Sequence, residues 1–456
     1  MNRIALRAYI VILVAVLLLG GFSFFLFEYA TQAEDWVIQN GSPHVYDGGN
    51  IATGVVTDRE GVLLLDMTDG RKYSSSEAVR KTTVHWVGDR YGSVNAPALS
   101  HYSTELTGFD MLTGTYKYGE NGGVARLTLS SKVQTAALEA LGEYKGTVGV
   151  YNYKTGELIC AVTTPGYDPD NVPTTGLETG GPNEGIYVNR FTQSVYIPGS
   201  IFKVVTLAAA LETIPDVQEQ KFTCTGEYKL GSKKITCEEK HGNQDLKMAF
   251  RNSCNCAFAE ISQQLGADTL ERFVEQFGVT KSVQFDGITT KAGNYDLEGA
   301  MSWDIAWSSI GQYTDQVNPC TFLTFMGAIA GDGQGVTPYL VEKITCDSTV
   351  TYAAKTETRD RIMSASTAKV LQEYLGFNVE NKYGSDKFPG MTVCGKTGTG
   401  EVGGNKKPNA MFVGFVEDAQ YPLAFIVAVE DGGYGVKVSV PIAAKVLAAC
   451  KEALDK

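Results

Sequence analysis

The sequence is short of positive charge. Its 456 residues include 51 acidic and 39 basic side chains, which gives a formal net charge of −12 at pH 7. Because a nucleic-acid partner requires a basic face that neutralises phosphates, this balance argues against such a partner. The sequence also has no low-complexity tract, no strong short repeat and no long run of like charge. Its length is enough for two or three ordinary globular domains.

Histidine is scarce as well. The four histidines are scattered along the chain, and no G-x-S-x-G element is present. Both observations argue against a Ser-His-Asp hydrolase. The histidines are His44, His85, His101 and His241.

The nine cysteines lack the clustered spacing of a zinc site, so we expect no metal centre. An odd number of thiols cannot pair completely within the chain. Cys224 and Cys237 stand at the two ends of a hairpin-like segment. The sequence is compatible with a disulfide between them and equally with two free thiols. Three further cysteines lie in apolar stretches and are expected to be plain core residues: Cys160, Cys394 and Cys450.

The sequence has one long apolar run. It extends from Ala8 to Phe27 and has 20 residues without a charge. That length spans a bilayer. Arg3 and Arg7 precede the run, so the positive-inside rule predicts a cytoplasmic tail at residues 1–7 and a transmembrane anchor at residues 8–28, with the rest of the chain outside. A cleaved signal peptide is the alternative, but the length of the run and the lack of a clean small-x-small site favour a retained anchor.

The remainder is expected to form two units. Residues 36–124 are polar and rich in glycine and tyrosine, and are long enough for a small pedestal domain. Within them, residues 55–57 and 62–65 predict a hairpin, and residues 74–88 predict a short capped helix.

Residues 125–456 show strand patterns near both ends and mostly helical patterns in the middle, at residues 243–330. We predict an α+β fold, in which an antiparallel sheet built from both ends is covered by helices and the middle forms a helical subdomain. The expected strands lie within residues 146–162, 390–401, 409–417 and 421–431, and the expected amphipathic helices are 129–141 and 440–456.

One helix in this unit carries an unusual pair. The stretch YIPGSIFKVVTLAAALE covers residues 196–212 and is almost wholly apolar from Ile201 to Leu211, yet it contains Lys203, three residues after Ser200. Residues at this spacing share a helix face. A buried lysine is easily deprotonated and can serve as a base, and a serine where a helix starts has free N–H groups nearby. The ordinary alternative is a capping serine with a snorkelling lysine.

Two later elements change the balance between these alternatives. Ser253-Cys254-Asn255 follows Ser200 by 53 residues, and Lys396-Thr397-Gly398-Thr399 lies on a predicted strand. Each is weak alone, but S-x-x-K, S-x-N and K-T-G in this order form the signature of penicillin-binding proteins and class A β-lactamases.

On these residues the chain resembles a monofunctional, class B penicillin-binding protein, a peptidoglycan D,D-transpeptidase of the penicillin-binding/serine β-lactamase-like fold. Residues 53–61, TGVVTDREG, depart from the usual R-G-x-I-x-D-R-x-G at Thr53, where an arginine and its ion pair are lost. Gly400 replaces the usual alanine after K-T-G-T, a change expected to be minor. Further similar stretches lie at residues 156–171, 310–341 and 409–435.

The resemblance implies a role for each motif residue. Ser200 would attack the penultimate carbonyl of a stem peptide ending in D-Ala-D-Ala, with Lys203 as base. Ser253 would relay a proton, Asn255 would orient Lys203 and the substrate amide, and Lys396 would keep the site electropositive. The remaining expected substrate contacts are Thr397, Gly398 and Thr399, with the N–H groups of Ser200 and Thr399 as the oxyanion hole. No metal or nucleotide is required.

The resemblance also implies partners and leaves rivals open. Peptidoglycan stem peptides would be substrates, β-lactams would be covalent inhibitors, and a polytopic membrane glycosyltransferase would contact the anchor and pedestal. A D,D-carboxypeptidase or serine β-lactamase would keep the chemistry and use water as acceptor. A β-lactam sensor or an inactive scaffold is the non-enzymatic alternative.

Overall fold

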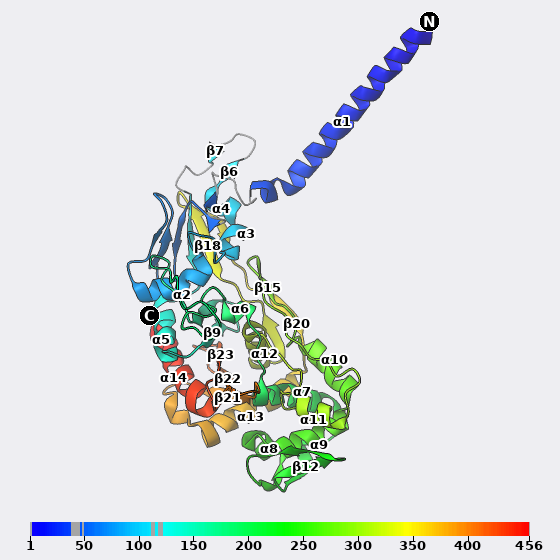
Figure 1. Ribbon diagram of the computed structural model, residues 1–456, viewed down its shortest axis with the longest axis vertical. Coiled ribbons are helices and arrows are strands. Elements are labelled where there is room, and N and C mark those ends of the chain that lie inside the picture. The colour runs from blue at the N-terminus through cyan, green and yellow to red at the C-terminus, as the bar shows by residue number, and fades with distance from the viewer. Residues whose placement is uncertain (1, 38–45, 48–49, 111–114, 117–121, 456) are drawn as a thin grey trace.

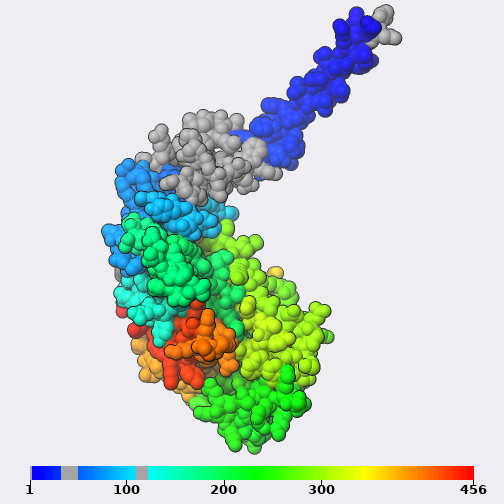
Figure 2. All heavy atoms as spheres, in the orientation of Figure 1, coloured from blue at the N-terminus to red at the C-terminus, as the bar shows by residue number. Residues whose placement is uncertain are grey.

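The computed structural model describes residues 2–37, 46–47, 50–110, 115–116 and 122–455. His44 and parts of the predicted pedestal, residues 36–124, lie outside the described residues. One long helix, α1 (Asn2–Val37), projects away from the body of the molecule (Figures 1 and 2).

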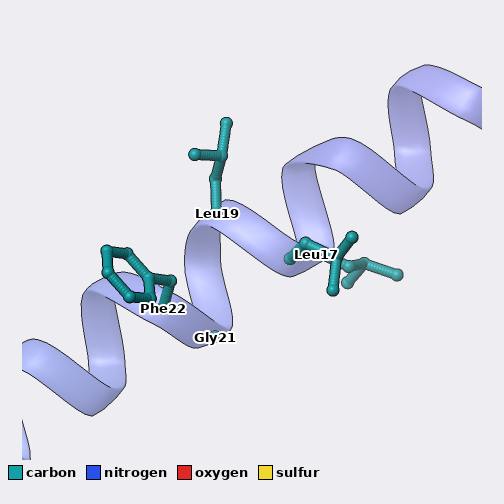
Figure 3. Close-up of a pocket in the computed structure, with 5 residues that line it drawn as sticks. Leu17, Leu19, Gly21 and Phe22 are labelled. Atoms are coloured by element: carbon teal, nitrogen blue, oxygen red, sulfur yellow. The ribbon is translucent and has the colours of Figure 1, made fainter.

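The apolar part of α1 is fully exposed. Its segment Arg3–Thr31 is long and apolar enough to cross a membrane, and none of its most apolar window is buried. Figure 3 shows Leu17, Leu19 and Phe22 pointing outward from the helix with no other segment opposite them. The helix continues past residue 28, where the sequence predicts the anchor to end, and it begins before residue 8.

A five-stranded antiparallel sheet forms the centre of the body, in the order β10-β9-β23-β22-β21. Strand β9 pairs with β23, so the two ends of the second unit meet as predicted. All residues of β10, β22 and β23 are buried, which explains their continuous apolar runs. The strands are β9 (Gly146–Asn152), β10 (Leu158–Thr164), β21 (Val393–Gly400), β22 (Asn409–Val416) and β23 (Leu423–Val429).

Helices cover both faces of this sheet, which confirms the predicted layered α+β architecture. On one face α5 (Ser131–Leu141) and α14 (Gly435–Leu454) pack together over β10 and β22. On the other, α12 (Pro319–Ala330) lies against β9, β22 and β23. Two large apolar clusters lie on the two faces of the sheet, and a third, small cluster lies around Tyr167.

The middle of the chain forms a helical subdomain, as predicted, with small strand pairs added to it. Its helices are α7 (Lys203–Thr213), α8 (Leu246–Asn252), α9 (Asn255–Leu265), α10 (Ala267–Phe277), α11 (Ser302–Ser308) and α13 (Ala365–Asn378). The strand pairs are β11 (Lys221–Cys224) with β14 (Gly242–Asp245), β12 (Glu227–Leu230) with β13 (Lys233–Thr236), β15 (Gln284–Phe285) with β16 (Ile288–Thr289), and β17 (Gln334–Val336) with β20 (Thr358–Arg361).

A second sheet of six strands, in the order β19-β18-β8-β3-β4-β5, does not follow the predicted boundary at residues 124/125. That boundary falls inside β8, and β18 and β19 come from a later part of the chain. The predicted hairpin is confirmed as β3 and β4. The strands are β3 (Val55–Thr57), β4 (Leu63–Asp66), β5 (Lys72–Tyr73), β8 (Val124–Leu127), β18 (Val341–Cys346) and β19 (Thr349–Ala353).

Short helices complete the described structure. The predicted capped helix is α2 (Glu77–Val87), and the Ser76 side chain accepts a hydrogen bond from the N–H of Val79. The other short elements are α3 (Pro97–His101), α4 (Ser103–Thr107), α6 (Arg190–Gln193), η1 (Gly199–Phe202), η2 (Val217–Glu219), η3 (Val379–Tyr383), η4 (Ser385–Lys387), β1 (Tyr46–Asp47), β2 (Asn50–Ile51), β6 (Phe109–Asp110) and β7 (Thr115–Tyr116).

Candidate active site

Ser200 lies in a tight turn that leads into the buried helix α7. The sequence predicts that Ser200 starts the helix. Instead, Pro198 is the capping residue and Ser200 is the second residue of the 3-10 turn η1, which runs directly into α7. The first residue of this turn, Gly199, has a φ of +54°, a conformation that glycine adopts at little cost.

Close backbone contacts hold this turn against β21. A Cβ atom on Gly199 would lie 2.3 Å from the carbonyl oxygen of Thr399, and one on Gly398 would lie 2.6 Å from that of Pro198. At Gly400 the corresponding distance, to the oxygen of Ile197, is 2.1 Å. The glycine after K-T-G-T, expected to be a minor departure, is therefore required by close packing in this chain.

The amine of Lys203 is the centre of a hydrogen-bond network. Its Nζ donates to Ser200 Oγ at 3.1 Å and to Asn255 Oδ1 at 2.6 Å. It also lies 3.1 Å from Ser253 Oγ and 2.7 Å from the Ser253 carbonyl oxygen. The side chain of Lys203 is fully buried, so a snorkelling lysine is excluded.

Burial changes the protonation of both lysines in the site. Removal from water is the main cause that lowers the pKa of Lys203 to about 8. Burial also holds the pKa of Lys396 well below its ordinary value, and repulsion from Lys203 and Lys382 lowers it further. With this pKa, about one tenth of the Lys203 amine is neutral at pH 7, far more than for a lysine in water.

Ser253 sits between the two lysines. Lys396 Nζ donates to Ser253 Oγ at 3.1 Å, the same distance at which Lys203 Nζ approaches that oxygen. Lys396 also donates to the carbonyl oxygen of Thr397 at 3.0 Å. A hydroxyl held by two amines can receive a proton from one neighbour while it donates its own to another group.

These residues surround one cleft of about 590 Å³ between β21 and the helical subdomain. The motif residues that line it are Ser200, Ser253, Asn255, Thr397 and Thr399.

The other three motif residues lie beneath the surface of the cleft. Lys203 and Lys396 are fully buried, and Gly398 packs against Pro198 and Ile201. All eight residues singled out from the sequence thus come together, although they are spread over almost 200 positions.

Sequence reasoning missed a tyrosine that supports β21. Tyr383 lies at the end of η3, a π turn that follows α13. Its hydroxyl accepts hydrogen bonds from Thr397 N at 3.3 Å and from Thr397 Oγ1 at 3.2 Å. The π turn gave no recognisable signal in the sequence, although such turns often occur at functional sites.

A cysteine cluster behind Asn255 was also missed. The ligand atoms of Cys224, Cys237, His241 and Cys254 all lie within 4.8 Å of one another. The expectation that these cysteines are not clustered is wrong, because β11 pairs with β14 so that Cys224 faces Gly242, next to His241. None of the nine cysteines is in a disulfide. Cys160, Cys394 and Cys450 are buried, which confirms them as core residues.

Comparison with known proteins gives a consistent result. The family described as "Penicillin binding protein transpeptidase domain" matches residues 146–448. Peptidoglycan D,D-transpeptidase PbpA of Mycolicibacterium smegmatis is 29% identical over 339 residues, 68% of each chain. Stage V sporulation protein D of Bacillus subtilis is 26% identical over 414 residues, covering 86% of this chain and 60% of that protein.

Solved structures are similar over almost the whole chain. The D,D-transpeptidase domain of a peptidoglycan glycosyltransferase from Eggerthella lenta has a TM-score of 0.75 at 27% identity, covering 88% of this chain and 98% of that chain. Penicillin-binding protein A of M. tuberculosis, solved as a ceftriaxone acyl-enzyme complex, has a TM-score of 0.74 at 25% identity, covering 87% and 98%.

Proposed function

Because this chain belongs to the penicillin-binding protein transpeptidase family, we propose that it is a peptidoglycan D,D-transpeptidase that works through an acyl-enzyme on Ser200 and is inhibited by β-lactams. The observation that carries this proposal is the buried amine of Lys203, 3.1 Å from Ser200 Oγ. The curated relatives named as D,D-transpeptidases and the acyl-enzyme of the M. tuberculosis protein support the same function.

In the first half-reaction, neutral Lys203 removes the proton of Ser200 Oγ, which attacks the carbonyl carbon between the two terminal D-alanines. The N–H groups of Ser200 and Thr399 stabilise the resulting oxyanion. The contacts between Gly199 and Thr399 support this role, because they hold the two backbones side by side. The side chains of Thr397 and Thr399 hold the terminal carboxylate, with Lys396 supplying positive potential.

The peptide bond then breaks, and its nitrogen leaves as the amine of D-alanine with a proton supplied through Ser253. The position of Ser253 Oγ, 3.1 Å from both lysines, supports a relay from Lys203. In the second half-reaction the amine of a neighbouring stem peptide attacks the ester and loses a proton to the same relay. This step forms the new peptide bond and frees Ser200.

Helix α1 is proposed to anchor the enzyme in the membrane with the catalytic body outside the cytoplasm. The exposed apolar surface of the helix supports an anchor. Arg3 and Arg7 at its start support a cytoplasmic N-terminus. The same helix and the six-stranded sheet are the surfaces offered to a polytopic membrane glycosyltransferase. Cross-linking of lipid-linked peptidoglycan precursor, with and without such a glycosyltransferase, tests this partner.

The central experiment is intact-protein mass spectrometry of the full-length chain after addition of penicillin. We expect one stable adduct, which peptide mapping places in the segment IPGSIFK around Ser200. The Ser200→Ala variant should show none, whereas the exposed control Ser385→Ala should behave as wild type. An adduct at another residue would contradict the proposal, and rapid hydrolysis of penicillin would point to a β-lactamase.

A further inference from the structure

We propose that Cys224, Cys237, His241 and Cys254 bind one structural zinc ion in the wall of the cleft, where Cys237 and His241 line it. Their four ligand atoms lie within 4.8 Å of one another, and the sulfurs of Cys237 and Cys254 are 3.7 Å apart. A tetrahedral zinc with Zn–S bonds of about 2.3 Å places two sulfurs about 3.8 Å apart. The spacing therefore matches a metal-bound pair of thiolates.

The four ligands come from four positions that the strand pairing brings together. Cys224 ends β11, Cys237 follows β13, His241 precedes β14, and Cys254 caps the N-terminus of α9. Two backbone contacts hold these positions together. They are the pairing of β11 with β14 and the hydrogen bond from the Cys237 N–H to the Gly226 carbonyl, at 3.0 Å.

His241 supplies a second, independent observation. Its Nδ1 atom is buried and has no hydrogen-bond partner among the residues that the structure describes. A buried ring nitrogen without a partner is costly, and coordination to a metal removes that cost. Three thiolates and one imidazole form a closed set of four soft ligands, which is typical of a structural zinc site rather than a catalytic one.

A disulfide explains the cluster less well than a metal. A bond between Cys237 and Cys254, or between Cys224 and Cys237, would use two sulfurs and leave the third thiol and His241 without a function. In an oxidising compartment adjacent free thiols are exposed to oxidation, and Cys256 is a fourth thiol in contact with these three. Zinc would hold all three as thiolates, with release of their protons on binding.

The local fold gives zinc a structural role. The segment between Cys224 and His241 contains one short strand pair, β12 with β13, in which only Ile235 is buried. Such pairs are marginal without a further cross-link. In Figure 1 these strands and helices α8 and α9 lie together at the end of the molecule farthest from α1.

The site also reaches the catalytic residues. Cys254 stands between Ser253 and Asn255, and the N–H of Asn255 donates to Cys237 Sγ at 3.0 Å. The Nδ2 atom of Asn255 donates to the carbonyl oxygen of Thr236, the residue before Cys237. Zinc would thus fix the position of Asn255 Oδ1 against Lys203. This positioning role rests on the proposed function, whereas metal binding itself does not.

The test is metal analysis of the full-length chain, purified in detergent with a histidine-free tag. We expect one zinc ion per chain by inductively coupled plasma mass spectrometry. Cys224→Ser should lose zinc, and so should His241→Ala. His241→Cys should retain it, because a fourth thiolate completes the set. Cys450→Ala, which removes a buried cysteine outside the cluster, should keep its full zinc content.

Cobalt binding to the wild-type chain gives a second test, which does not depend on whether the cysteine and histidine variants fold. The cobalt form of the wild-type chain should show absorption from thiolate-to-cobalt charge transfer, and Cys450→Ala should show the same absorption. A chain without zinc that cannot take up cobalt, or a mass that reveals a disulfide among these cysteines, would overturn the proposal.

Catalysis is measured separately. Removing zinc with a chelator should slow penicillin acylation about 10- to 100-fold, the usual effect of losing groups that support a site, and added zinc should restore the rate. Unchanged acylation after complete zinc removal would overturn the positioning role. Ser200→Ala should retain zinc while losing the adduct, so failure of the proposed function and failure of the zinc site give different results.

Discussion

The cleft has two walls that are built in different ways. One wall, formed by η1 and β21 and here termed the β21 wall, rests on the central sheet, and most of its residues are buried. The other, residues 221–255 and here termed the cysteine wall, is built from short strand pairs, helix α8 and the start of α9. Lys203 bonds to both, through Ser200 on one side and Asn255 on the other.

The difference concerns how each wall is kept in place. The β21 wall is held by backbone contacts that admit no side chain at Gly199, Gly398 or Gly400, and by the sheet behind it. Outside α8 the cysteine wall contributes few buried apolar side chains to the core, among them Phe222 and Ile235. Its geometry therefore depends more on specific side-chain bonds. Removing one polar group should therefore affect the cysteine wall more than the β21 wall, unless that group is shared by both.

Lys203 is the shared group, and its loss should have the largest effect. We expect Lys203→Ala to slow penicillin acylation about 10²- to 10⁴-fold, the usual contribution of a positioned base. The fold should remain nearly intact by thermal unfolding. Stopped-flow acylation measures the rate, with the exposed Lys369→Ala as the matched control. Fast acylation by Lys203→Ala would remove this lysine from its proposed role.

Asn255 tests the cysteine wall alone. Asn255→Ala removes the 2.6 Å bond to Lys203 and the bond to the carbonyl of Thr236. Because hydrogen bonds to charged groups contribute about 1.5–3 kcal/mol, we expect acylation to fall about 10- to 100-fold. Asn171→Ala, an exposed asparagine outside the cleft, is the control. An effect below twofold would mean that the cysteine wall does not position Lys203.

The β21 wall was much easier to predict from the sequence than the cysteine wall. The Ser200–Lys203 pair is local, since both residues lie on one turn of chain, and the K-T-G strand shows in its own pattern of residues. The cysteine cluster depends on β11 pairing with β14. Strand β11 alternates polar and apolar residues, but β14 has no apolar residue, so its sequence does not reveal the pairing. The six-stranded sheet was missed for a different reason, because β18 joins β8 from more than 200 residues away.

The pH dependence of acylation tests the shared lysine without a substitution. Burial lowers the pKa of Lys203 to about 8. The fraction of Lys203 with a neutral amine therefore increases as the pH rises towards that value. The acylation rate should therefore increase about tenfold per unit between pH 5 and 7 and level off above 8. A midpoint near 10.4, the ordinary value for lysine, would show that Lys203 titrates as if it were in water.

Tyr383 tests the β21 wall and should give the smallest effect. Tyr383→Phe removes the hydroxyl that accepts from Thr397 N and Oγ1, but keeps the ring that packs edge-on against Phe412 at 5.7 Å. A neutral hydrogen bond contributes about 0.5–1.5 kcal/mol, so we expect the second-order acylation constant to fall about 2- to 10-fold. The sheet behind β21 should prevent a larger loss.

Tyr421→Phe is the matched control for this last substitution. Its hydroxyl bonds to Asp455 at the end of α14, away from the cleft, so acylation should stay at the wild-type rate. A loss at Tyr383 as large as that at Asn255 would break the distinction between the two walls. It would mean that β21, like the cysteine wall, relies on single polar contacts rather than on the packing of its backbone.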